Sequence, residues 1–161
     1  MSRPNALEPD WDAEGGSGPF RWRRARVGRM AGARELGASV FELPPGASTF
    51  PLHCHYANEE LLVVLRGSPV LRQAGGEREL AEGEVVSFPV GREGAHRIDN
   101  RGDAPVRVLI VSTMVGPDVV EHLDSEKIFA RSYAPGADPP EDAVEVMVKR
   151  EDSRPFFEGE L

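Results

Sequence analysis

The feature of this sequence that most limits its fold is the regular alternation of short apolar runs with glycine- and proline-rich turns. The chain contains 17 glycines and 14 prolines, and many of them stand between these runs. The runs cover residues 37–43, 60–65, 70–73, 85–88, 96–98 and 106–113. Short strands with such spacing are typical of an antiparallel barrel or sandwich, so the sequence predicts an all-β fold.

Changes in composition divide the chain into three parts. Residues 1–19 are polar, acidic and rich in glycine, which predicts a flexible N-terminal arm. Residues 20–116 contain all the apolar runs and form the predicted barrel. Residues 117–161 hold 12 acidic and 5 basic side chains, and we expect this C-terminal extension to pack on the barrel or on a second subunit.

Two segments at the ends of the chain have a predicted structure of their own. Residues 20–27 mix large apolar residues with arginines, which indicates a strand. We expect its arginines to pair with the acidic extension or with a second subunit, and anion binding is the alternative. Within the extension, residues 124–131 are predicted to form a short helical turn, and residues 143–148 a strand. Alternate positions of that strand are valine, so its valine face is expected to be buried.

Charge and hydropathy exclude several classes of protein. The net charge of -8 argues against nucleic-acid binding, which requires a basic surface. No apolar run approaches the ~20 residues that span a bilayer, and the first residues contain no hydrophobic leader, so a cytoplasmic protein is expected. The single cysteine, Cys54, excludes an internal disulfide, and we expect it to pack as a small apolar side chain.

Three of the four histidines lie in two short neighbourhoods. His53 and His55 are two residues apart, so in a strand both imidazoles point to one face. Glu60 opens the next apolar run, and an antiparallel pairing would bring its carboxylate to the same point. His96 supplies a third imidazole from a later strand. Three imidazoles and one carboxylate suit a divalent iron, manganese, nickel, copper, zinc or cobalt ion.

These two neighbourhoods resemble the paired motifs of the cupin superfamily. The first motif has the form G-x5-HxH-x3,4-E-x6-G, and here it reads Gly46, His53, His55, Glu60 and Gly67 with one extra residue before His53. The second has the form G-x5-PxG-x2-H-x3-N, and here it reads Gly83, Pro89, Gly91, His96 and Asn100 with two extra residues before His96. The resemblance covers about half of the chain.

The resemblance implies a double-stranded β-helix that binds one divalent metal ion through His53, His55, Glu60 and His96. It also implies a homodimer, because compact cupins pair through sheet edges, and a small-molecule ligand or substrate. Glu60 is additionally expected to be the catalytic residue that takes a proton.

Some residues near these motifs leave alternatives open. Glu59 is the alternative to Glu60 as a ligand, but the six-residue step to Gly67 favours Glu60. His122 falls outside both motifs and is expected on the surface. Inward strand positions should line an apolar pocket, and the candidates are Leu62, Val64, Ile98, Phe41 and Met114.

Three functions fit this site. The favoured one is a dioxygenase-like oxidoreductase. The second is a non-redox metal-dependent isomerase, lyase or decarboxylase, in which the metal acts as a Lewis acid. The third is a small-ligand-binding protein without turnover. The fold does not decide among them.

Overall fold

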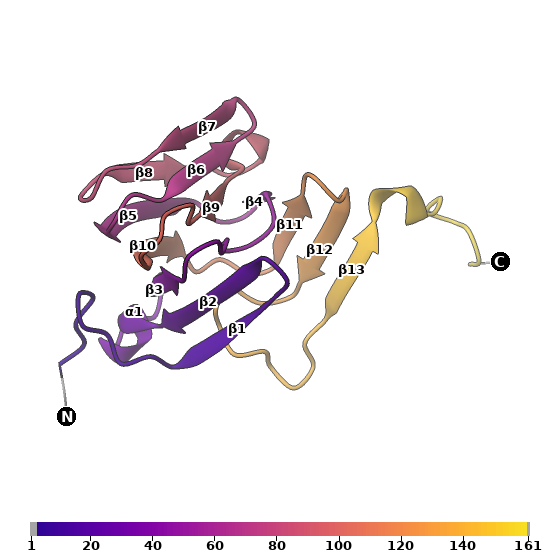
Figure 1. Cartoon of the computed structure of the whole chain (residues 1–161). Coiled ribbons are helices and arrows are strands. Elements are labelled where there is room, and N and C mark those ends of the chain that lie inside the picture. Colours follow the sequence, from indigo (N-terminus) through magenta and orange to yellow (C-terminus); the bar gives the residue numbers. More distant parts are fainter. Residues whose placement is uncertain (1–2, 161) are drawn as a thin grey trace.

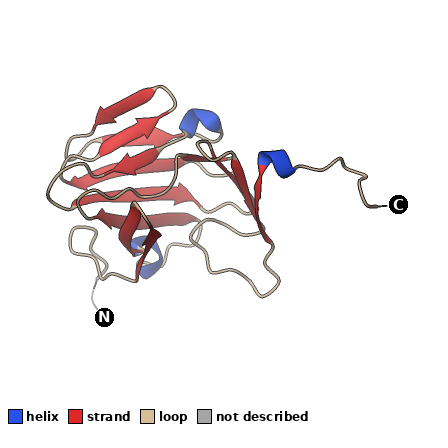
Figure 2. Ribbon diagram, turned by 45° about the vertical axis from the view of Figure 1, so that its right-hand side comes forward, coloured by secondary structure: helices blue, strands red, loops and turns tan. Residues whose placement is uncertain are grey.

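The computed structural model describes residues 3–160, and almost all of its regular structure is β-strand (Figure 1, Figure 2). The largest sheet has six antiparallel strands. In spatial order they are β1 (Ala13–Ser17), β2 (Phe20–Ala25), β3 (Leu36–Leu43), β10 (Val106–Thr113), β5 (Glu60–Arg66) and β8 (Val85–Phe88). The predicted all-β fold is therefore confirmed.

Two smaller antiparallel sheets complete the fold. The four-stranded sheet has the order β13 (Glu145–Lys149), β12 (Lys127–Arg131), β11 (Asp118–His122) and β4 (His53–His55). The three-stranded sheet has the order β7 (Gly76–Glu79), β6 (Val70–Gln73) and β9 (Arg97–Asp99). The helical elements are one short helix, α1 (Val27–Met30), and the 3-10 turns η1 (Arg92–Gly94) and η2 (Arg150–Asp152).

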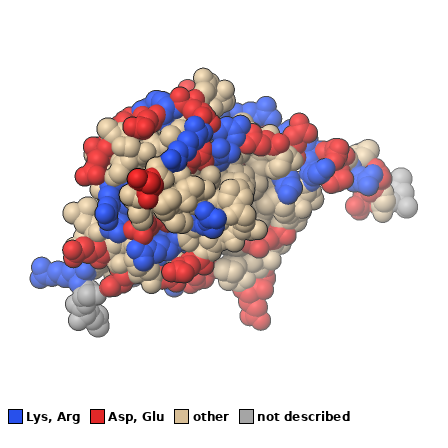
Figure 3. All heavy atoms as spheres, viewed as in Figure 1, with Lys and Arg blue, Asp and Glu red and all other residues tan. Residues whose placement is uncertain are grey.

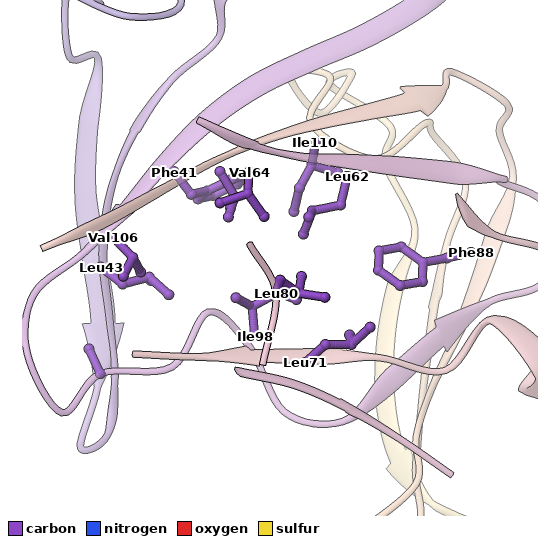
Figure 4. Close-up of a cluster of buried hydrophobic side chains, with 12 residues drawn as sticks. Phe41, Leu43, Leu62, Val64, Leu71, Leu80, Phe88, Ile98, Val106 and Ile110 are labelled. Atoms are coloured by element: carbon purple, nitrogen blue, oxygen red, sulfur yellow. The ribbon is translucent and has the colours of Figure 1, made fainter. Parts of the chain in front are cut away.

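The main hydrophobic core lies between the six-stranded and three-stranded sheets (Figure 4). Alternation along β5 and β10 explains it, because every second residue of each strand is buried. Leu62, Val64 and Ile98 are fully buried in this core and do not line a pocket, contrary to their expected role. On β5 the inward face begins with Glu60, so the same alternation that buries leucine and valine turns this carboxylate inward.

The N-terminal segment is more structured than its composition indicates. Its residues from Ala13 to Ser17 form β1, which pairs with β2 along the whole strand. The boundary expected after residue 19 therefore falls inside a hairpin. Arg23 of β2 pairs with Glu42 of β3, and Arg26, which lies between β2 and α1, pairs with Asp138 of the C-terminal extension.

In the C-terminal extension, the helical turn predicted at residues 124–131 is wrong, because residues 127–131 form β12 between β11 and β13. Cross-strand pairing on both sides outweighs a weak local helical preference. The strand predicted at residues 143–148 is found as β13. Its valines are exposed in the single chain rather than buried: Val144 by 59%, Val146 by 44% and Val148 by 41%.

We expect the protein to form a homodimer through this exposed strand. β13 is an edge strand that projects from the body of the molecule, and its valine face is continuous with Val119 on β11 across the same sheet. Light scattering at micromolar concentration should give about twice the 17.6 kDa chain mass. The double substitution Val146→Asp with Val148→Asp should give monomers, and a parent protein of single-chain mass would contradict the expectation.

Candidate metal centre

The imidazoles of His53 and His55 lie on the same face of strand β4. His53 and His55 are both buried, and their ring centroids lie 5.2 Å apart. Cys54, between them, points to the other side and packs with Leu52 and Ala95, as expected for a small apolar side chain. Burial raises the pKa of the Cys54 thiol, which keeps it protonated and unreactive at neutral pH.

Glu60 and His96 reach the same place from two other segments. The backbones of His53 and His96 exchange two hydrogen bonds, of 3.2 Å and 2.9 Å, which hold the segment before β9 beside β4. The Glu60 carboxylate lies 3.4 Å from His96 Nε2 and 3.7 Å from His55 Nε2. His53, Glu60 and His96 each place a potential ligand atom within 4.8 Å of the others, so this buried group can hold a metal ion.

The Nδ1 atom of each of the three imidazoles lies within hydrogen-bond distance of an oxygen atom. His53 Nδ1 lies 2.9 Å from the carbonyl oxygen of Pro51, and His96 Nδ1 lies 2.9 Å from that of Gly94. His55 Nδ1 lies 2.6 Å from Asp118 Oδ2. A carbonyl or carboxylate oxygen can only accept, so Nδ1 carries the hydrogen in each neutral ring and Nε2 keeps its lone pair. This is the tautomer that a metal ligand needs, so the residues present fit a metal ion.

Burial favours the neutral form of the His53 and His96 imidazoles. It lowers the pKa of His53 well below the ordinary range, and the neighbouring His96 and His55 lower it further. Burial also lowers the pKa of His96, although Glu60 and the Gly94 carbonyl act in the opposite direction. Both rings are therefore neutral at pH 7 and available to a cation.

Asp118 belongs to the site but has no place in the sequence motifs. It lies on β11, which pairs with β4, and its side chain is buried. Burial raises the pKa of this carboxyl group, but the hydrogen bond with His55 and further hydrogen bonds outweigh burial and lower it overall. Asp118 is thus an ionised carboxylate that orients His55. Sequence reasoning missed it because it lies 63 positions from its partner, in the segment assigned to the extension.

Replacing Asp118 with asparagine should lower metal affinity by about 10- to 100-fold, since carboxylates that orient a ligating imidazole contribute to that extent. The matched control is Asp124→Asn, which removes the same charge from an exposed aspartate paired with Arg72. Competition with a chelator of known affinity measures the effect. Equal affinities for the two variants would exclude the positioning role of Asp118.

The structure also places the residues that the sequence left open. Glu59 is exposed, beside the inward Glu60. The expectation of a surface position for His122 is wrong: its ring is partly buried, lies 6.4 Å from that of His53, and lines the same cavity. Pairing of β11 with β4 sets His122 opposite His53, an arrangement that no local pattern reveals.

A cavity of about 710 Å³ opens from this cluster between the six-stranded sheet and the sheet of β11, β12 and β13. Much of its wall is apolar or aromatic, and Phe41 and Met114 contribute to it as expected. Trp22, Phe41 and Phe50 pack on one another with centroids 5.5–5.9 Å apart. A cavity of this size and lining suits a small organic molecule.

Residues 39–112 match the sequence model of a family described as "Cupin domain". Among curated proteins, the tetracenomycin polyketide synthase protein TcmJ of Streptomyces glaucescens is 34% identical over 95 residues, which are 58% of this chain and 62% of that protein. The chain covers less than two thirds of the length of the curated relatives it matches.

Solved structures show the same fold over most of the chain. A sugar phosphate isomerase from Silicibacter pomeroyi superposes with a TM-score of 0.77 and 21% identity, covering 94% of this chain and 95% of that one. A polyketide cyclase from Streptomyces resistomycificus superposes with a TM-score of 0.55 and 24% identity, covering 70% of this chain and 79% of that one. Within residues 3–160, no helix has the length and apolar character needed to cross a membrane.

Proposed function

We propose that the chain, whose residues 39–112 match the cupin domain family, is a non-redox metal-dependent enzyme that moves a proton on a carbonyl compound with a large apolar body. The observation that carries the proposal is the placement of a free imidazole, His122, in the wall of an apolar cavity beside the buried ligand cluster. The reaction would be an isomerisation or a cyclisation.

The related proteins favour this reaction class over the dioxygenase interpretation. The solved relatives are described as an isomerase and a cyclase, and neither reaction type requires oxygen. The curated relative is described as a polyketide synthase protein. Polyketide chains are rich in carbonyl groups and can be cyclised to fused rings, and the apolar lining around Trp22, Phe41 and Phe50 complements such a body better than it does a small sugar.

Four side chains would hold the metal ion in this proposal: His53, His55, Glu60 and His96. A divalent ion bound there would polarise a carbonyl oxygen of the substrate as a Lewis acid. Glu60 would be the anionic ligand, and it lies close enough to the other ligands to accept a proton within the site as well.

His122 would be the main proton carrier. Its ring makes no hydrogen bond with the described residues 3–160, so a nitrogen is free to accept. The carbon–hydrogen bond next to the carbonyl breaks, its electron pair shifts toward the carbonyl group, and the proton goes to His122. Return of the proton to another atom completes an isomerisation without net oxidation. The apolar wall would exclude water during this transfer.

The test uses 1-tetralone, a bicyclic ketone, with the metal-loaded protein in heavy water. Proton NMR should show exchange at the carbon next to the carbonyl faster than in buffer, with no oxygen uptake at an oxygen electrode. His122→Asn should slow this exchange at least tenfold at unchanged metal content, since a general base contributes about 10²–10⁴-fold. Oxygen uptake coupled to loss of the ketone would contradict the proposal and favour the dioxygenase interpretation. Hydrogen exchange no faster than in buffer would also contradict it and favour a ligand-binding protein without turnover.

A further inference from the structure

The wall of the cavity carries more basic than acidic side chains, although the protein is negatively charged overall. Five arginines line the cavity, against two carboxylates, Glu60 and Asp138, while the chain carries a net charge of -8. On the face drawn in Figure 3, by contrast, basic and acidic side chains are interspersed. The arginines of the wall are Arg24, Arg26, Arg29, Arg34 and Arg131.

Most of these arginines are paired or exposed. Arg24 pairs with Asp12, while Arg26 and Arg29 share Asp138 at distances of 3.1 Å and 2.7 Å. Arg34 is exposed to solvent. Pairing and hydration therefore satisfy four of the five guanidinium groups before any ligand arrives.

Arg131 differs from them. Its side chain is only 14% exposed, and its Nε–H is the one buried side-chain polar group among residues 3–160 without a hydrogen-bond partner. Arg131 Nη2 forms an ion pair with Asp118 Oδ2 at 3.6 Å, but this separation is beyond hydrogen-bond distance. Asp118 is already engaged by His55 Nδ1 and by the backbone N–H of Ala57. A buried donor without a partner is costly, so its presence in the fold needs a reason.

The guanidinium group of Arg131 is also held in place. It packs 5.3 Å from the ring centroid of Phe129 and 5.9 Å from that of Tyr133. Glu145 faces Arg131 across the β12–β13 pair, but its carboxylate accepts the hydrogen bond of the Tyr133 hydroxyl. Among the described residues, no carboxylate oxygen lies within hydrogen-bond distance of the guanidinium group of Arg131.

We propose that Arg131 binds an oxyanion, a carboxylate or a phosphate, carried by the molecule that occupies the cavity. The planar guanidinium fork matches either group in a bidentate arrangement. Arg131 and the ligand cluster are linked through Asp118 and His55, so a bound molecule can place its anionic end at Arg131 and its body along the apolar wall. The substrate class, an anionic polycyclic carbonyl compound, rests on the proposed function; the anion site itself does not.

Calorimetry with three matched probes tests the site: 1-naphthoate, 1-naphthyl phosphate and the neutral 1-naphthamide. We expect at least one of the two anions to bind at least tenfold more tightly than the amide, and the comparison of the two identifies the preferred oxyanion. Arg131→Gln should weaken binding of that anion at least tenfold and change binding of the amide less than twofold. Arg154→Gln is the control, because it removes an equal charge from a side chain that is 75% exposed on the C-terminal arm.

The measurements are made on metal-loaded and on chelator-treated protein, because an anion could instead bind the metal ion. If Arg131→Gln binds the anion as tightly as the parent in the chelator-treated state, the proposal is overturned. Circular dichroism checks folding, and Arg131→Lys, which keeps the charge but loses the fork, should give an intermediate affinity. Failure of the 1-tetralone exchange would overturn the proposed reaction and leave this binding result intact.

Discussion

Replacing His96 with alanine should abolish metal binding while the barrel remains folded. His96 Nε2 lies inside the ligand cluster, so its removal takes away a ligand atom that no neighbouring side chain replaces. The main hydrophobic core consists of aliphatic and aromatic side chains and does not depend on this imidazole, although Phe88 stacks on the ring at 3.7 Å between centroids. Elemental analysis measures the metal, and circular dichroism measures the fold.

His53→Ala should give the same loss, and Cys54→Ala is the matched control because Cys54 lies between the two histidines and points away. Metal binding by the parent should persist when the pH falls below about 6.5, the ordinary imidazole value, and should decline only in more acidic solution. The direction follows from the lowered pKa of His53 and His96, since a lower pKa delays competition by protons. Full metal occupancy in both alanine variants would contradict the ligand assignment.

Glu60→Gln should weaken metal binding strongly, because Glu60 is the only anion of the cluster. Glutamine keeps an oxygen atom and nearly the same shape but removes the negative charge. A divalent ion would then have no anionic ligand among the four proposed ones, in a buried site where charge compensation counts more than it does in water. Metal titration against a competing chelator measures the loss, which we expect to be at least tenfold.

Glu59→Gln is the control for this experiment. Glu59 carries the same charge one position away, but its side chain is exposed, so its contribution to metal affinity should be close to zero. A large effect of Glu59→Gln with none of Glu60→Gln would show that the first motif is assigned one residue out of place.

The parts of the site that depend on local sequence were predictable. Alternation along a strand puts His53 and His55 on one face and Cys54 on the other, and motif spacing selects Glu60 over Glu59. His96 was found because its surrounding glycine, proline and asparagine form a second spaced pattern. The first of these inferences needs only the period of a strand. The choice of Glu60 and the inclusion of His96 rest on the resemblance to the paired cupin motifs.

The parts that depend on strand order were not predictable. Asp118, His122 and Arg131 join the site only because β11 pairs with β4 on one side and with β12 on the other. Nothing in the sequence around these residues specifies that order. The same pairing turned the expected helical segment into β12, since the hydrogen bonds of two neighbouring strands outweigh local preference.

The pairing of β4 with β11 also limits how far the chain can be shortened from its C-terminus without disrupting the proposed metal site. The match to the cupin domain family ends at residue 112. Strand β11, which pairs with β4, and Asp118, whose carboxylate orients His55, both lie beyond that residue. A chain cut after Thr113 would keep all four proposed ligands in its sequence. It would lose the strand that aligns two of them, so we expect a fragment that keeps the proposed metal site to extend at least to His122.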